Sequence, residues 1–351
     1  MGTLKKELVD LAVSMGAVGA RVADLETLEK PPSADPTYVL PGAQSVIAFA
    51  VPLGTDFIPD YLGKVTRMVF RRVMYEKYQL IGAIGEAMVV CLQEKGFQAV
   101  SPSPNGVYRS EVSKRGFMVP DFSLRYAAVA SGLGTFGWSG NVLVEGHWST
   151  VFLGAAVTDA VLPPDAPLDK SLCDDCRICA GVCPLEFIKG KESQTVSLGG
   201  RKYSYNAKGN HARCGLACSG LSGVTRDGKW SSWATLRYEF PEDDSELVPQ
   251  FMRALNDPAS AYIRGHIGFS SAGGRAEWAI EAQETKKGVL LRSLEDTNPT
   301  CCHCVLVCSG PLDRRRELMK LLHSSGVVVR LEDGTEKAIK PEELQKAEQK
   351  D

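Results

Sequence analysis

Long apolar runs are absent from this chain, and cysteine is almost absent from its first half. No stretch approaches the roughly 20 apolar residues of a transmembrane helix, and residues 1–20 lack the apolar run of a signal peptide. Arg71-Arg72 lies inside the chain, so it cannot serve as an N-terminal twin-arginine signal. These absences predict a cytoplasmic protein that does not enter a membrane.

A strong net charge is also missing. The formal net charge is −2 and charged residues make up 23% of the 351 residues, so nothing predicts binding to nucleic acid or to an anionic membrane. Hydrophobic residues make up 44%, which is an ordinary globular composition. The basic runs Arg71-Arg72 and Arg314-Arg315-Arg316 are typical of solvated helix faces. The length suits one large domain or two moderate ones.

The cysteines that are present lie almost entirely in the second half. Of eleven cysteines, ten lie beyond residue 170 and only Cys91 precedes it. Disulfides seldom persist in the cytoplasm, so thiols segregated in this way indicate metal binding. Cys91 lies in an apolar helical stretch, where we expect a buried core residue.

Residues 1–165 alternate helical and strand patterns, which predicts an α/β or α+β domain with a mixed sheet. The expected helices lie at about 3–16, 60–96 (one helix or a pair) and 122–134. The expected strands lie at about 16–25, 45–53, 97–104 (a strand and a loop) and 141–162 (two strands joined near Gly146). The proline-rich segment 162–171 closes this domain.

Residues 166–330 are predicted to form a second, cysteine-rich domain. It would carry a loop-rich insertion at 184–300, whose glycine-rich sequence shows little periodicity before 245–257. Residues 331–351 are expected to be a charged tail, with a small hairpin around Asp333-Gly334 followed by a frayed helix.

The first cysteine run has the spacing of bacterial ferredoxins. Cys173, Cys176, Cys179 and Cys183-Pro184 follow the pattern C-x2-C-x2-C-x3-C-P. In two-cluster proteins of that type the fourth cysteine serves the other cluster. Three closely spaced thiolates can hold three irons of a cubane, but the same tight loop cannot reach the fourth iron. The run therefore predicts [4Fe-4S] clusters whose ligands cross between two runs.

The second run, Cys301-x2-Cys304-x3-Cys308, repeats this spacing without a leading cysteine. The crossing rule then assigns ligands to two clusters. Cluster 1 takes Cys173, Cys176, Cys179 and Cys308, and cluster 2 takes Cys183, Cys301, Cys304 and one further thiol. Cys214 and Cys218 are the unassigned thiols between the runs, and we favour Cys214.

Zinc is the alternative interpretation, because CxxC pairs are common zinc ligands and eight thiolates could hold two ions. The complete C-x2-C-x2-C-x3-C-P run favours iron–sulfur clusters. Cys302, beside a ligand, is expected to be a bystander. His211 and His303 are expected to be surface or core residues.

A glycine-rich segment precedes the cysteines. Gly132-x-Gly134-x-x-Gly137 formally matches the dinucleotide fingerprint GxGxxG. It follows a helical pattern instead of opening a helix after a strand, which favours a helix stop and a tight loop. By itself it predicts no nucleotide cofactor.

Segment 125–144, with the cysteine runs at 173–184 and 300–310, resembles the epoxyqueuosine reductase and reductive dehalogenase superfamily over roughly residues 35–330. The resemblance implies a nitroreductase-like corrinoid-binding domain followed by a ferredoxin-like domain, with a base-off cobalamin and two [4Fe-4S] clusters. In this family the glycine loop lies against the corrinoid. The cofactor-binding residues implied here are Gly132, Leu133, Gly134, Gly137, Trp138, Gly140 and Asn141.

This resemblance implies an iron–sulfur oxidoreductase that passes electrons to the corrinoid for reductive chemistry on a small organic substrate. A ferredoxin or flavodoxin would supply the electrons. The family's proton-donating aspartate, counted back from Gly132, falls on Met118, which cannot donate a proton. Candidate proton donors near the expected upper face of cobalt are Tyr108, Arg109, Asp121, Arg125 and Tyr126.

Met118 suits an alternative function that needs no proton donor. The chain would then be an electron-transfer protein that reduces the corrinoid of a partner protein, such as a methyltransferase, or a corrinoid carrier without turnover. A closed pocket above cobalt would favour the reductase, and an open face would favour the electron-transfer protein.

Overall fold

A four-stranded sheet with the order β1-β2-β6-β3 organises the first half of the chain. The computed structural model describes residues 2–28, 32–102, 104, 109, 119–188, 191–260, 294 and 297–343. Tyr108 and Met118 lie outside these residues. The strands of the sheet are β1 (Gly19–Asp24), β2 (Ser45–Pro52), β3 (Ala99–Val100) and β6 (Val151–Thr158).

Every described pairing in this sheet is antiparallel, which corrects the expectation of a mixed sheet. A helical crossover carries the chain from β2 to β3, and these two strands do run in the same direction. However, β6 lies between them and pairs antiparallel with both. Two fold classes were expected, α/β and α+β, and the antiparallel sheet of the described residues is typical of α+β.

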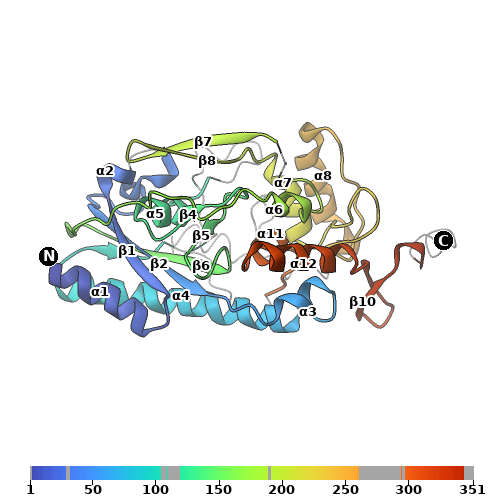
Figure 1. Ribbon diagram of the computed structural model, residues 1–351, viewed down its shortest axis with the longest axis horizontal. Coiled ribbons are helices and arrows are strands. Elements are labelled where there is room, and N and C mark those ends of the chain that lie inside the picture. Colours follow the sequence, from blue (N-terminus) through green and yellow to red (C-terminus); the bar gives the residue numbers. More distant parts are fainter. Residues whose placement is uncertain are drawn as a thin grey trace.

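The sheet is buried on both faces, which explains the unbroken apolar run of β2. Ile47, Phe49 and Val51 face a cluster formed with α1 (Gly2–Ser14) and α4 (Met68–Glu94). Alternate residues of β2 face a second cluster, formed with α2 (Leu25–Leu28) and α5 (Leu124–Ala130). Figure 1 shows α1 and α4 together below the sheet and α5 above it.

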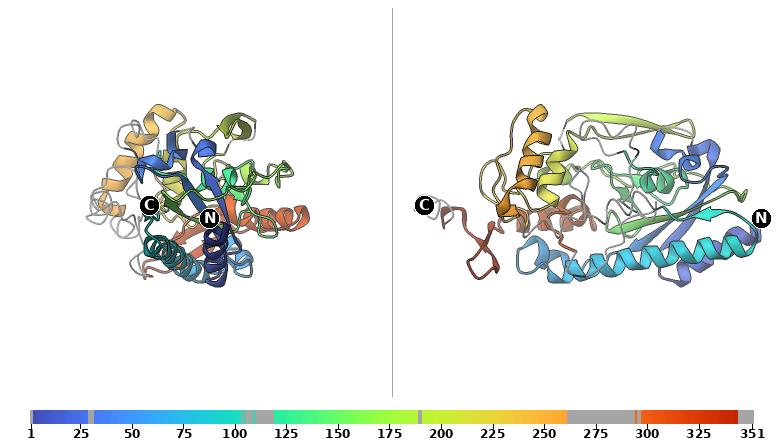
Figure 2. Two further views of the ribbon diagram at one scale, coloured as in Figure 1. Left: turned by 90° about the vertical axis from the view of Figure 1, so that its left-hand side faces the viewer. Right: turned by 180° about the vertical axis from the view of Figure 1, so that it is seen from behind.

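The segment 60–96 forms a pair of helices, α3 (Ile58–Leu62) and α4, as one of the two expectations proposed. The 27 residues of α4 run the length of the sheet and reach the cysteine-rich end of the molecule (Figure 2). There Tyr61 and Phe70 pack with Trp230, Trp233 and the helix α12 (Leu312–His323). The two halves of the chain therefore share an apolar core at this end.

Residues 193–206 are a β-hairpin, although we expected loops in this segment. Strand β7 (Ser193–Leu198) pairs with β8 (Arg201–Asn206) around Gly199-Gly200. The hairpin lies above α5 (Figure 1), and Val196, Leu198 and Tyr205 join the core on that face of the sheet. The Gly-Gly turn between two alternating runs was a hairpin signal that the sequence analysis missed.

The remaining elements are short. The expected hairpin around Asp333-Gly334 is present as β9 (Val327–Arg330) and β10 (Glu336–Ile339). The strands β4 (Thr135–Phe136) and β5 (Val142–Leu143) bracket the second part of the glycine-rich segment. The other helices are α6 (Ile178–Gly181), α7 (His211–Cys218), α8 (Asp244–Asn256) and α11 (His303–Leu306).

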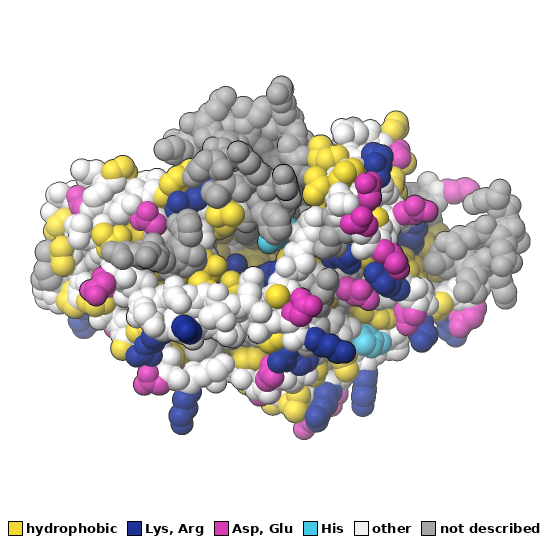
Figure 3. Space-filling model, turned by 90° about the horizontal axis from the view of Figure 1, so that it is seen from above, with side chains coloured by type: hydrophobic (Ala, Val, Ile, Leu, Met, Phe, Trp, Pro, Cys, Tyr) yellow, Lys and Arg dark blue, Asp and Glu magenta, His cyan; other side chains and the backbone are white. Residues whose placement is uncertain are grey.

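None of the helices in the described ranges combines the length and the apolar character needed to cross a bilayer. On the described part of the face seen from above, acidic and basic side chains are interspersed (Figure 3).

We predict that Gly154→Ala destabilises the sheet. Gly154 faces Phe49 across the β2–β6 pair, and an added Cβ would overlap the Phe49 ring, which is fully buried and cannot move aside. Such overpacking costs about 1–3 kcal/mol, measurable as a lower urea midpoint. Gly2→Ala in α1, where an added Cβ meets nothing, is the control. Equal midpoints for the two variants would contradict this account of the sheet.

Candidate metal centre

The two cysteine runs form loops of the same local conformation. In each loop the residue after the first cysteine of a CxxC pair has a left-handed backbone, with φ 57° at Arg177 and φ 67° at Cys302. Each of these residues then caps a one-turn helix, α6 or α11, and the two helices pack against each other. Cys302 therefore occupies the position of Arg177, and it packs in the apolar core with Tyr61 and Leu306.

The structure brings Cys308 to the first run, as the crossing rule predicts. Cys179 interacts electrostatically most strongly with Cys304 of the second run, and then with Cys308, Cys173 and Cys176. Burial raises the pKa of Cys308 to about 11, and the neighbouring Cys173 and Cys176 act in the same direction. We call Cys173, Cys176, Cys179 and Cys308 thiol group one.

Cys183 lies instead with the second run. Burial raises its pKa, and so do the neighbouring thiols Cys301, Cys304 and Cys214. Burial followed by Cys301 and Cys214 raises the pKa of Cys304 to about 12. We call Cys183, Cys214, Cys301 and Cys304 thiol group two.

Cys214 and Cys218 both reach thiol group two, because they lie one turn apart on α7. Their sulfur atoms are 3.6 Å apart. Cys214 interacts with Cys183 and Cys304, whereas Cys218 interacts with Cys301 as well as with Cys214. The two thiols therefore approach different members of group two, and Cys214 as the ligand stays a prediction.

Several N–H groups point at these sulfur atoms. The backbone N–H of Trp138 donates to Cys173 Sγ at 3.3 Å, and that of Phe187 donates to Cys183 Sγ at 3.2 Å. Asn141 Nδ2 lies 3.6 Å from Cys304 Sγ, and Arg315 Nη1 donates to Cys176 Sγ at 3.3 Å. Donors of this kind stabilise thiolates and tune the potential of clusters bound by them.

The donor set fits two [4Fe-4S] clusters. Thiols that raise one another's pKa are expensive to ionise together unless a cation lies between them. Within the described ranges, no three His, Cys, Asp or Glu side chains are arranged to hold a single metal ion. A [4Fe-4S] cubane differs from a single metal ion, because each of its four irons binds one of the four thiolates. His303 is fully buried beside the rings of Tyr61 and Trp230, which agrees with a core role.

The glycine-rich segment packs against protein. An added Cβ at Gly132, where φ is +72°, would overlap the carbonyl oxygen of Ala166, and one at Gly134 would overlap that of Leu143. Gly137 lies against the Leu143 side chain, and Leu133 is part of the core above the sheet. These glycines are therefore needed for the packing of the loop itself.

The end of this loop lies between the two thiol groups. Trp138 contacts Cys173 through its N–H, Asn141 contacts Cys304, and Gly140, with φ +74°, lies against Tyr205 and Lys208. Asn141 also borders a cavity of about 180 Å³ with Arg125, Val142, Ser149 and Val305. The same loop therefore contacts both thiol groups and lines a cavity beside thiol group two.

A corrinoid does not fit the site in this form. The space beside Gly132 and Gly134 is filled by backbone, and the cavity is smaller than the roughly 300–1,000 Å³ of ordinary ligand sites. Trp138 and Asn141 are close to cysteine sulfurs instead. The contact of this loop with a corrinoid stays a prediction.

Among the described proton-donor candidates, only Arg125 borders the cavity, and its Nη1 donates to Gly140 O at 2.6 Å. Tyr126 turns toward Tyr205, with 3.3 Å between the hydroxyl oxygens, and burial raises its pKa. Asp121 is buried, and its Oδ1 accepts from the N–H of Phe122. Arg109 donates to Asp121 O and stacks on the Tyr38 ring.

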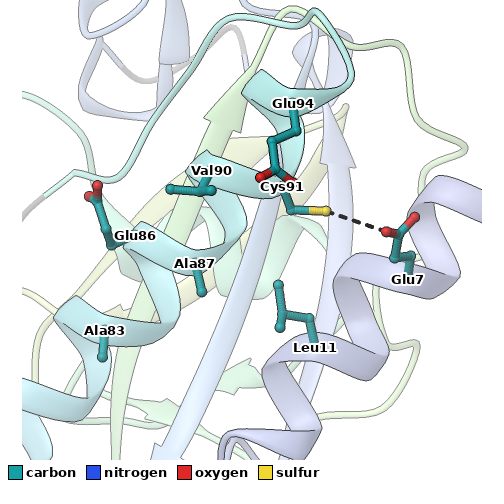
Figure 4. A pocket seen from close by; sticks show the side chains of 8 residues that line it. All are labelled: Glu7, Leu11, Ala83, Glu86, Ala87, Val90, Cys91 and Glu94. Carbon is teal, nitrogen blue, oxygen red and sulfur yellow. Dashed lines mark hydrogen bonds between the residues drawn. The ribbon is translucent and has the colours of Figure 1, made fainter.

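Cys91 lies apart from the other thiols. It is half-buried in an open groove between α1 and α4, where its Sγ lies 3.7 Å from Glu7 Oε1 (Figure 4). The expectation of a buried core position is therefore corrected, because Cys91 faces the rim of the α1–α4 contact.

Three cations near the thiols were not found from the sequence. Arg315, expected on a solvated helix face, is 3% exposed and bonds to Cys176 and Asp174. Lys64 and Lys208 interact electrostatically with thiol group two. Burial lowers the pKa of each lysine to about 7. Consecutive helical residues point about 100° apart, so three adjacent arginines cannot all lie on one exposed face of α12, and this was the sequence signal that could have suggested Arg315.

Comparisons with known proteins find relatives that are all reductases. Epoxyqueuosine reductase of Synechococcus sp. (strain RCC307) is 29% identical over 171 residues, 47% of this chain and 47% of that protein. The enzyme of the same name from Atelocyanobacterium thalassa is 27% identical over 173 residues, 47% of this chain and 50% of that protein. The chain thus matches about half the length of these relatives. No protein-family model matches.

Solved structures of two kinds are also similar. An epoxyqueuosine reductase bound to a modified tRNA stem loop has a TM-score of 0.41 at 17% identity, covering 71% of this chain and 66% of its own. A catabolic reductive dehalogenase has a TM-score of 0.43 at 17% identity, covering 59% of this chain and 28% of its own. The relationship of this chain to known proteins therefore rests on the sequence matches and not on these structural similarities.

The relatives support a reductive redox function for this class of protein. The sequence matches therefore support the resemblance of this chain to the epoxyqueuosine reductase and reductive dehalogenase superfamily.

We predict that Cys308→Ser removes the cluster held by Cys173, Cys176 and Cys179. Because Cys308 lies in thiol group one, iron should fall from about eight to about four per chain. The electron paramagnetic resonance signal that disappears should be the one that Cys173→Ser also removes. Cys302→Ser is the control and should keep both signals. If Cys308→Ser instead removes the signal lost in Cys301→Ser, the crossing is wrong.

A second pair of variants separates the two thiols of α7. Cys214→Ser should lower the iron content by about half, because Cys214 interacts electrostatically with Cys183 and Cys304 of group two. Cys218→Ser should keep the iron of the unchanged protein. The reverse pattern, measured by metal analysis after identical reconstitution, would assign Cys218 as the ligand.

Proposed function

We propose that the chain is an iron–sulfur reductase whose two thiol groups each hold a [4Fe-4S] cluster. One cluster would be bound by thiol group one, which consists of Cys173, Cys176, Cys179 and Cys308. The other cluster would be bound by thiol group two, which consists of Cys183, Cys214, Cys301 and Cys304. The observation that carries this proposal is the crossing of Cys183 and Cys308 between the two runs. When bound, the clusters supply electrons one at a time at low potential.

The chain's own residues would connect these electrons to an acceptor. The cavity bordered by Arg125 and Asn141 touches thiol group two through Asn141, and Val305 of α11 also lines it. Arg125, whose Nη1 is fixed by Gly140 O, would place a positive charge where an acceptor gains electrons. A small organic molecule with a reducible oxygen or halogen is the substrate class that the superfamily suggests. A ferredoxin-type or flavodoxin-type protein would donate the electrons.

The superfamily resemblance adds a base-off cobalamin between cluster and substrate. In that case the cavity beside Asn141 would have to widen, because about 180 Å³ is too small for a corrinoid. A second candidate function needs no corrinoid-sized cavity in this chain: the chain would reduce the corrinoid of a partner protein and would not hold one permanently.

Reoxidation of the reduced protein tests this proposal. The chain is reconstituted anaerobically with iron and sulfide, reduced, and mixed with cobalamin alone or with cobalamin and a panel of organohalides and epoxides. We expect rapid reoxidation, because thiol group two lies beside the cavity. Cys304→Ser should slow it at least tenfold, and Cys302→Ser should not.

The arms of this experiment separate the candidates. Cobalt that stays bound after gel filtration, with substrate consumed, supports the reductase. Reoxidation by cobalamin without bound cobalt or substrate turnover supports the electron-transfer function. A reduced protein that none of these acceptors reoxidises would contradict both.

A further inference from the structure

The fixed charges around the two thiol groups differ. At thiol group one the cations are arginines, and each has an aspartate partner. Arg315 donates to Asp174 Oδ1 at 2.8 Å as well as to Cys176 Sγ. Arg177 lies over the Trp138 ring and forms an ion pair with Asp175 at 2.6 Å. The charges of these two arginines and two aspartates therefore cancel among the described residues beside group one.

At thiol group two the cations are lysines without such partners. Lys64 is 7% exposed, interacts electrostatically with Cys301, and donates to Leu62 O at 3.4 Å. Lys208 Nζ lies 5.6 Å from the centre of the Phe187 ring and interacts with Cys304 and Cys214. Within the described part of the chain, neither lysine forms an ion pair with a carboxylate. Arg125, beside Lys208, adds a further positive charge.

The backbone gives no reason for a lysine at position 64. Lys64 has φ +60°, a conformation that glycine or asparagine adopts more easily. A buried ammonium group is also costly unless an anion accompanies it. Both costs are explained if the side chain is required for its charge, and the thiolates of group two are the anions within reach.

We propose that Lys64 and Lys208 are counter-charges of the cluster at thiol group two and raise its reduction potential. The inference rests on the proposed function, because it requires that cluster. Reduction makes a thiolate-bound cluster more negative, so a nearby buried cation stabilises the reduced form over the oxidised one. The lysines would thus favour the reduced state at the site that borders the cavity.

The test is a potentiometric titration of the reconstituted full chain, followed by electron paramagnetic resonance. Lys64→Met and Lys208→Met remove the charges and keep most of the side-chain length. Each variant should lower the ratio of reduced to oxidised cluster about tenfold at a fixed potential. This change is equivalent to lowering the reduction potential of a one-electron couple by about 59 mV. The affected signal should be the one that Cys304→Ser lacks. Lys64→Arg and Lys208→Arg should restore the ratio, and Lys202→Met on the exposed face of β8 should leave it unchanged.

Unchanged ratios in both methionine variants would overturn the inference while leaving the clusters, and so the proposed function, in place. A change confined to the signal that Cys304→Ser retains would also overturn it. If the methionine variants lose the group-two cluster and the arginine variants keep it, the charge requirement is supported. If arginine fails as methionine does, it is contradicted. A chain that assembles no cluster at all would instead overturn the proposed function, and this inference with it.

Discussion

Mutual repulsion among thiolates is the constraint on which this structure depends. Each thiol group gathers four cysteines from segments far apart in the chain, and neighbouring thiols add to the effect of burial in raising the pKa of Cys179, Cys183 and Cys304. Burial acts in the same direction, so ionising them together without a counter-charge would oppose folding. The two proposed cluster cores are cationic and would remove this conflict, because each thiolate would then bind its own iron. Cluster binding and the folding of the cysteine-rich half of the chain would therefore be coupled.

The rest of the molecule holds the cysteine loops in place. Tyr61 of α3 donates its hydroxyl to Cys301 O at 2.7 Å, and Ser149, just before β6, bonds to Cys308 O through both its N–H and its hydroxyl. The glycine-rich loop adds the contacts of Trp138 and Asn141. The antiparallel sheet and α4 therefore serve as a rigid frame. Its loops, not its strands, reach the sulfur atoms.

The sequence predicted the parts of this protein that depend on local patterns. The helix pair within 60–96, the buried strand at 45–53, the hairpin at Asp333-Gly334 and the equivalence of the two cysteine loops follow from periodicity, turn chemistry and spacing. The reach of a tight loop predicted that Cys308 lies near the first run and Cys183 near the second, whereas their roles as ligands stay a prediction. The division into domains at 165 and 330 stays a prediction.

Features set by distant contacts could not be predicted in this way. The insertion of β6 between β2 and β3 made the sheet antiparallel, and no local pattern encodes strand order. The glycines of the loop are explained by Ala166 and Leu143, which become neighbours only on folding. Lys64, Lys208 and Arg315 look like ordinary surface cations until tertiary packing places them beside thiols.

The measurement that tests this account most directly is the iron and acid-labile sulfide content of the anaerobically purified chain, with zinc determined in the same sample. The account predicts about eight irons and about eight sulfides per chain, and little zinc. About two zinc ions without labile sulfide would contradict it, because the eight thiols would then be a pair of structural zinc sites.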